Sequence, residues 1–179
     1  RILVETAVLN GISKEDAENK LGGLIRLTIE YFKEHKNETN VPALPGVKDL
    51  LEEVNERHIP LGLLTGNIES IAWDKLKIAG LDKYFKFGAF GDRGKKRVDL
   101  VYIAKERATK SLGRGVQISE FVIIGDTVLD VECAKEAGIK CIGVASGPDY
   151  SLADLKDAGA DLVISSLEEK NKILEFLSN

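Results

Sequence analysis

The sequence predicts an α/β fold in which a doubly wound parallel sheet carries helices on both faces. Strand-like and helix-like segments alternate along residues 42–179, as they do in chains of βαβ units. Two short apolar runs, residues 61–65 and 121–125, stop at glycine or polar residues, which is typical of buried parallel strands. Residues 1–41 lack such runs and are helical in pattern. We therefore expect two blocks, with a boundary near residue 41.

The first block should form helices followed by a hinge. Residues 2–9 are a short amphipathic segment. Residues 13–16 have the spacing of a capping box, and apolar residues then recur at helical spacing over residues 17–32. A polar stretch follows at residues 36–40, and the two prolines in residues 41–46 favour extended chain. This stretch predicts a domain hinge.

The second block should alternate between strands and helices up to the end of the chain. Apolar runs bounded by turn residues give the strands, and apolar residues at helical spacing, often closed by glycine, give the helices. The predicted strands are residues 61–65, 86–90, 121–125, 141–145 and 162–164, and the predicted helices are residues 47–56, 68–79, 100–111, 129–137, 152–158 and 167–177.

Composition narrows the class of protein. A chain of 179 residues that is 44% hydrophobic and 30% charged can bury a core. The net charge of -4 argues against a nucleic acid or an anionic membrane surface as partner. No apolar stretch approaches the length of a membrane span. Cys133 and Cys141 should be separated by about a helix length, which is too far for a disulfide. We expect buried thiols and a cytoplasmic protein.

Two aspartates follow the apolar run at residues 121–125. Asp126 stands at the carboxyl end of that predicted strand, and Asp130 falls in the first turn of the next helix. Ligands bind at the carboxyl ends of strands in open α/β folds, and Mg²⁺ takes one or two carboxylates together with phosphate oxygens and water. The alternative is that both acids only stabilise a helix N-terminus.

Two further segments should lie at the same edge of the sheet. After the strand at residues 61–65, the Thr65 hydroxyl and the amides of Gly66 and Asn67 can converge on an anion, although Thr-Gly-Asn is also ordinary turn chemistry. Residues 95–97, Lys-Lys-Arg, place positive charge between a strand and a helix. A charged loop is usually just solvated.

Taken together, these segments resemble motifs II, III and IV of the haloacid dehalogenase superfamily. The resemblance rests on residues 64–67, the basic loop and residues 125–130, and the flanking phrases at residues 44–51 and 75–85 strengthen it. The chain is most similar to the phosphoglycolate-phosphatase branch, which carries a helical cap. The resemblance implies that residues 1–41 are the C-terminal part of a helical cap and that residues 42–179 are the α/β core.

The resemblance also implies a reaction, namely Mg²⁺-dependent hydrolysis of a small phosphate monoester through an aspartyl-phosphate. Thr65 would hydrogen-bond the phosphoryl oxygens beside the amides of Gly66 and Asn67. Asp126 would bind Mg²⁺, and Asp130 would bind it or fix its ligands. We expect the basic residue of motif III to be Arg97, because it is nearest the following helix, in preference to Lys95 or Lys96.

Motif I of the family, a strand that ends in Asp-x-Asp-Gly-Thr, occurs nowhere in residues 1–179. The nucleophile and the general acid therefore cannot be named, and we expect the first strand and the front of the cap to lie outside this sequence. The motif I strand lies between the motif II and motif IV strands in the family. Residues 61–65 and 121–125 should then run parallel without hydrogen bonds between them, about 9 to 10 Å apart.

Two other functions remain open at this point. One is a metal-free 2-haloacid dehalogenase, although the presence of both Asp126 and Asp130 argues against it. The other is a non-catalytic domain of the same fold that binds or regulates. Neither the identity of the substrate nor the oligomeric state follows from the sequence.

Overall fold

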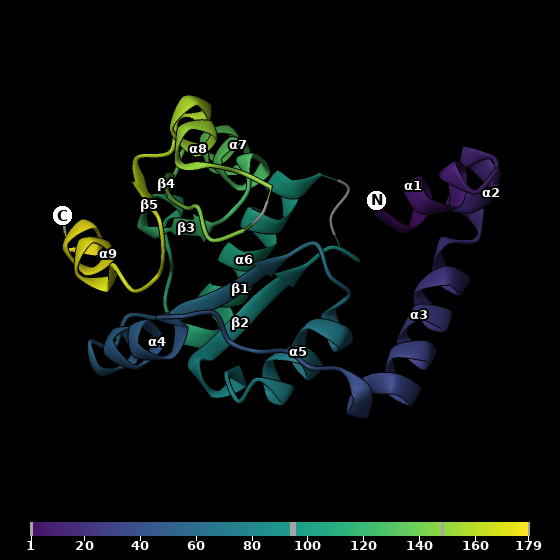
Figure 1. The fold of residues 1–179 in the computed structure, drawn as a ribbon, viewed down its shortest axis with the longest axis horizontal. Helices are drawn as coiled ribbons and strands as arrows, with labels where there is room; N and C mark the ends of the chain where they lie inside the picture. Colours follow the sequence, from purple (N-terminus) through teal and green to yellow (C-terminus); the bar gives the residue numbers. More distant parts are fainter. Residues whose placement is uncertain (1, 94–95, 148, 179) are drawn as a thin grey trace.

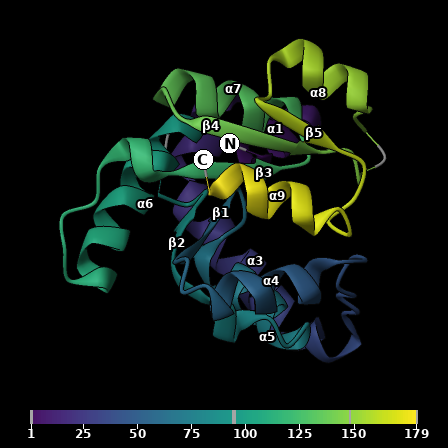
Figure 2. The same ribbon diagram turned by 90° about the vertical axis from the view of Figure 1, so that its left-hand side faces the viewer.

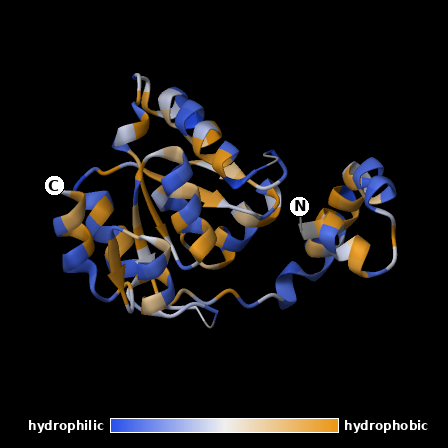
Figure 3. Ribbon diagram, turned by 90° about the horizontal axis from the view of Figure 1, so that it is seen from above, coloured by the Kyte–Doolittle hydropathy of each residue, from blue (hydrophilic) through white to orange (hydrophobic). Residues whose placement is uncertain are grey.

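The computed structural model describes residues 2–93, 96–147 and 149–178. Its first three helices form an arm that stands beside the core (Figures 1 and 3). They are α1 (Ile2–Leu9), α2 (Lys14–Asn19) and α3 (Leu21–His35). Half of the predicted capping box is present: the Asp16 backbone N–H donates to Ser13 Oγ at 3.1 Å, whereas the Asp16 carboxylate accepts the Ser13 hydroxyl rather than the Ser13 backbone N–H. The predicted helix over residues 17–32 is instead divided at Lys20, where α2 ends.

The arm buries little apolar surface. Val4, Ala7 and Ala17 form a small cluster between its helices, whereas α3 buries none of its residues. Tyr31 is 66% exposed. The arm continues into a 3₁₀ turn, η1 (Lys36–Glu38), and then into a segment without regular secondary structure that leads to α4.

The core contains the alternation that the sequence predicts. Its helices are α4 (Val47–Glu56), α5 (Glu69–Ile78), α6 (Arg97–Leu112), α7 (Val128–Ala137), α8 (Leu152–Ala158) and α9 (Lys170–Leu177). Its strands are β1 (Leu61–Thr65), β2 (Phe85–Phe90), β3 (Val122–Gly125), β4 (Lys140–Val144) and β5 (Leu162–Ile164), and the short 3₁₀ turns η2 (Asp82–Tyr84) and η3 (Ile118–Glu120) precede β2 and β3.

Every strand pairing in the described part of the chain is parallel, which confirms the predicted fold class. The strands are grouped in two sheets, β1 with β2 and β3 with β4 and β5. In the first sheet Thr65 lies opposite Phe90, and in the second Gly125 lies opposite Gly143. The ends of β1 and β2 are thus level with each other, as are the ends of β3 and β4.

Helices cover both faces of the sheets (Figures 1 and 2). One core cluster joins β3 and β4 to α7 and α8, with Val131, Ala134 and Leu155 fully buried. A second cluster joins β4 and β5 to α4 and α9, through residues such as Val54 and Ile173. The arrangement is the doubly wound one.

The two sheets lie next to each other but are not joined by a ladder. Leu64 of β1 and Ile123 of β3 belong to the same cluster on one face, and Leu61 and Val122 pack against the same cluster on the other face. Even so, β1 and β3 are not hydrogen-bonded to each other, as the sequence predicts.

The strands beside this break are also poorly buried. No residue of β1 is buried, whereas four of the five residues of β4 are. Ile124 of β3 is 38% exposed. Strands of parallel sheets normally bury both faces and pair on both edges. The residues of β1 and β3 are therefore less covered than those of β4.

No helix in the described part of the chain has the length and apolar character that crossing a membrane requires.

Candidate active site

The loop that follows β1, Thr65–Asn67 (the β1 loop), is compact and already folded around the Thr65 hydroxyl. The Asn67 backbone N–H donates to Thr65 Oγ1 at 3.2 Å. Because Oγ1 serves here as an acceptor, its own proton is left to donate to another group. Gly66 and Asn67 are both exposed. The loop can therefore present the Thr65 hydroxyl and the Gly66 backbone N–H to an anion, with the Asn67 N–H already donated to Thr65 Oγ1.

The loop after β2, Gly91–Arg93 (the β2 loop), supports the β1 loop from the side. The Gly91 N–H donates to the Asn67 carbonyl oxygen at 2.9 Å. A Cβ atom placed on Gly91 would stand 2.1 Å from the Gly66 carbonyl oxygen. Only glycine at position 91 allows the two loops to approach this closely.

Asp130 is the one charged side chain that is buried among the described residues, with 5% of its surface exposed. Its Oδ1 lies 2.5 Å from Arg97 Nη2. Its Oδ2 accepts the Thr127 hydroxyl at 2.7 Å and the Thr127 backbone N–H at 3.2 Å. A Cβ on Gly125 would lie 2.5 Å from Asp130 Oδ2, so glycine at the end of β3 makes room for this carboxylate.

Arg97 begins α6 and reaches across to α7, so its pair with Asp130 connects segments 33 residues apart in the sequence. Its side chain is 33% exposed. Arg97 Nε, in contrast, is buried and has no hydrogen-bond partner within the described ranges. A buried donor without a partner is costly. Arg97 therefore has hydrogen-bonding capacity left for a further acceptor.

Asp126 behaves differently from Asp130. It is exposed at the end of β3, and within the described residues its carboxylate forms no hydrogen bond or ion pair. The loop after β4 comes close to it, since a Cβ on Gly147 would lie 3.0 Å from Asp126 Oδ2. An open carboxylate at a strand end, with a second carboxylate on the next helix, is a donor set that Mg²⁺ accepts. The described residues contain no cluster of three or more acidic, cysteine or histidine ligands, so water or substrate oxygens would complete the coordination.

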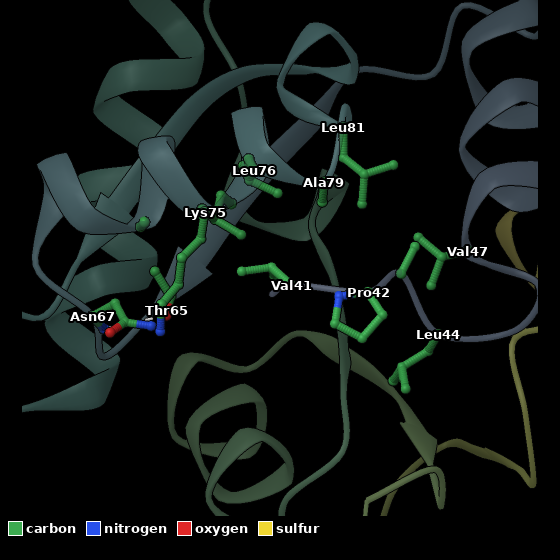
Figure 4. Close-up of a pocket in the computed structure, with 13 residues that line it drawn as sticks. Val41, Pro42, Leu44, Val47, Thr65, Asn67, Lys75, Leu76, Ala79 and Leu81 are labelled. Carbon is green, nitrogen blue, oxygen red and sulfur yellow. Dashed lines mark hydrogen bonds between the residues drawn. The ribbon is translucent and has the colours of Figure 1, made fainter. Parts of the chain in front are cut away.

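A cavity of about 260 Å³ opens beside the β1 loop. Figure 4 shows Thr65 and Asn67 at one end of it and the hinge residues Val41, Pro42 and Leu44 toward the other. Most of its wall is apolar, formed by α5, β1 and the hinge. The β1 loop therefore has open space next to it.

The cysteines lie in the core behind this region. Both are buried and unpaired with each other, as the sequence predicts. Burial raises the pKa of Cys133 to about 11 and that of Cys141 to about 12. Arg97 lowers the pKa of Cys133 in part, and Asp130 raises it. Both thiols are therefore protonated near neutral pH and suit packing rather than catalysis.

The sequence pattern predicts candidate site residues but not the residues that contact them. The structure brings Arg97 and Asp130 into contact, whereas Lys96 is exposed and Lys95 lies outside the described residues. Thr127 was missed, although its spacing from Asp130 is that of a capping box.

Sequence comparison with known proteins tests the resemblance to the haloacid dehalogenase superfamily. The family model for haloacid dehalogenase-like hydrolases matches residues 5–144. The chain is 31% identical over 166 residues to the phosphorylated carbohydrates phosphatase of Thermotoga maritima, a match that covers 86% of this chain and 73% of that protein. It is 28% identical over 148 residues to the phosphoglycolate phosphatase of Chromobacterium violaceum, covering 80% of this chain and 61% of the relative.

Solved structures agree with the sequence matches. A predicted phosphatase from Clostridium acetobutylicum aligns with a TM-score of 0.71 at 26% identity, covering 97% of this chain and 77% of the other. The chain spans less than two thirds of the Chromobacterium relative. The resemblance predicted from the motifs is confirmed. The chain belongs to the haloacid dehalogenase-like hydrolase family.

Proposed function

We propose that the protein is a cytoplasmic, Mg²⁺-dependent phosphatase that hydrolyses a small phosphate monoester through an aspartyl-phosphate. The observation that carries the proposal is the Arg97–Asp130 pair, in which Arg97 keeps a buried Nε without a hydrogen-bond partner among the described residues. Two relatives are named as phosphatases of phosphorylated carbohydrates and of phosphoglycolate. Both names describe small phosphorylated substrates.

We assign phosphoryl binding to the β1 loop and to Arg97. The Thr65 hydroxyl would donate to one phosphoryl oxygen, and the amides of Gly66 and Asn67 would lie beside it. Arg97 would donate from Nε, which has no partner in the described structure. Fixed donors of this kind are most effective where negative charge develops in the transition state. The pair with Asp130 would keep Arg97 in place.

Asp126 is the better placed of the two proposed metal ligands. Both oxygens of Asp130 already have partners, Arg97 on one side and Thr127 on the other. Asp126 would therefore hold Mg²⁺ directly, and Asp130 would do so only by releasing one of these partners. The bound cation would supply positive charge that offsets the repulsion between a phosphate dianion and an anionic nucleophile.

The nucleophile belongs, in this proposal, to a further strand between β1 and β3. Ile124 of β3 is exposed and the three leucines of β1 are only partly buried, and among the described strands β1 pairs with β2 alone and β3 with β4 alone. A strand inserted there would bury Ile124 and satisfy both edges. Its carboxyl end would emerge between Thr65 and Asp126, so a carboxylate there would face a phosphoryl group held by the β1 loop.

The test is release of inorganic phosphate from a panel of phosphate monoesters by the complete protein, with Mg²⁺ and with the cation removed by chelation. The proposal expects turnover of at least one small phosphorylated compound only when Mg²⁺ is present. Equal turnover after chelation would contradict the metal dependence. Turnover of 2-haloacids in place of phosphate esters would contradict the reaction itself.

A further inference from the structure

A network of charged residues outside the proposed catalytic groups ties the start of α5 to β2 and α6. Glu69 is the first residue of α5, directly after the β1 loop and Ile68. Its backbone N–H donates to Asp92 Oδ1 at 3.3 Å. Its carboxylate is bound by both terminal nitrogens of Arg107, Nη1 to Oε1 at 2.8 Å and Nη2 to Oε2 at 3.2 Å.

Arg107 is itself fixed from two other directions. Its Nη1 donates to the Gly88 carbonyl oxygen at 2.7 Å, on a strand that pairs, within the described ranges, with β1 alone. Its guanidinium carbon lies 5.5 Å from the centre of the buried Phe90 ring. The side chains of Glu69 and Arg107 are each 31% exposed, so the pair is partly shielded from water. A bidentate, charge-assisted contact of this kind fixes orientation as well as distance.

We propose that Arg107 is a positioning residue for phosphate binding, which acts by holding Glu69 and thereby the β1 loop in its anion-binding conformation. The loop is held by its backbone contact with Gly91 on one side and by Glu69 where the chain enters α5. Only Ile68 separates Asn67 from Glu69, so a rotation at the start of α5 would move the Asn67 amide directly. This inference rests on the proposed role of Thr65 and Asn67.

The Glu69–Arg107 pair also sets the net charge next to the β1 loop. Glu69 puts a negative charge in the first turn of α5, beside a loop proposed to bind a dianion. Arg107 neutralises that charge. The neighbouring Arg93 lies 3.9 Å from Glu69 and is 61% exposed, and so contributes little.

Arg107→Lys separates positioning from charge, because lysine keeps the positive charge but lacks the planar fork. Binding of inorganic phosphate to the complete protein would be followed through the amide chemical shifts of Gly66 and Asn67. We expect the dissociation constant for phosphate, and the KM of turnover, to rise on the order of tenfold to a hundredfold. The melting temperature and kcat should change little.

Two further variants complete the test. Arg114→Lys alters an arginine–carboxylate pair with Glu120 whose arginine is 54% exposed, and it should leave phosphate binding unchanged. Glu69→Gln breaks the same contact and should also weaken binding, but by less than Arg107→Lys, because it removes a negative charge next to the β1 loop. The double variant should be no worse than Arg107→Lys alone.

The possible results are distinct. Unchanged phosphate affinity in Arg107→Lys, or a fall in melting temperature and active fraction with KM unaltered, would overturn the positioning role. Additive losses in the double variant would also overturn it. If phosphate leaves the Gly66 and Asn67 amides of the wild type unmoved, the proposed function fails, whatever the variants do.

Discussion

The buried ion pair should make Asp130→Asn far more damaging to stability than a chemically identical change elsewhere. The matched control is Glu120→Gln. Each acid occupies the third position of a capping box and binds an arginine with one oxygen and a backbone N–H with the other. The two acids differ in burial, since the side chain of Asp130 is 7% exposed and that of Glu120 is 38% exposed.

The expected size of the effect follows from these contacts. An amide has only one acceptor oxygen, so in Asp130→Asn an N–H donor must face either Arg97 or Thr127. Disrupting a buried charge pair costs about 3–5 kcal/mol, but Arg97 is one-third exposed and can turn part of its charge to water. We expect a loss of about 2–3 kcal/mol in the free energy of unfolding. For the exposed Glu120 pair the expected loss is below about 1 kcal/mol.

Urea unfolding followed by circular dichroism measures both variants on the same scale. A loss of 2–3 kcal/mol would lower the melting temperature by roughly 5–10 °C in a chain of this size. Equal losses in the two variants would refute the reasoning, because burial would then not distinguish the pairs. A stabilised Asp130→Asn would show that the carboxylate is strained for function rather than for folding.

Two other predictions concern activity and thiol chemistry. Arg97→Ala should slow turnover on the order of a hundredfold, whereas Lys96→Ala, at an exposed site, should change turnover little. Steady-state kinetics of both variants would measure this difference. Equal small effects would mean that the basic loop is only a solvated, charged loop. Cys133 and Cys141 should react with a thiol reagent at pH 8 only after denaturant is added. At this pH about one Cys133 thiol in a thousand is ionised. Rapid labelling of the native protein would contradict the burial of both thiols.

The sequence predicts strands better than it predicts the starts of helices. Residues 61–65 form β1 as expected, because a short apolar run has little alternative in a parallel sheet. Helix α6 begins at Arg97 rather than at residue 100. Its cap comes from the Asp99 side chain, which accepts the Lys96 N–H at 2.8 Å. Lys96 itself carries no helix-start signal, so the pattern alone places the start too late.

The sequence predicts the candidate site residues at strand ends but not the contacts between helices. Thr65 and Asp126 follow apolar runs, and that pattern is visible in the chain. The contacts Arg97–Asp130 and Glu69–Arg107 join helices that are distant in sequence, and they depend on packing that no local pattern encodes. The roles assigned to the site residues stay predictions.

The most direct test of the proposed function is phosphate release by Asp126→Asn in the complete protein, assayed at saturating Mg²⁺ with the best substrate of the panel. The Asp126 side chain is exposed and has no partner among the described residues, so the change should leave the melting temperature unaltered. It removes an anionic ligand without changing side-chain volume, and we expect turnover to fall to background. Turnover equal to that of the wild type at ordinary Mg²⁺ concentration would contradict the assignment of Asp126 and, with it, the metal-dependent mechanism.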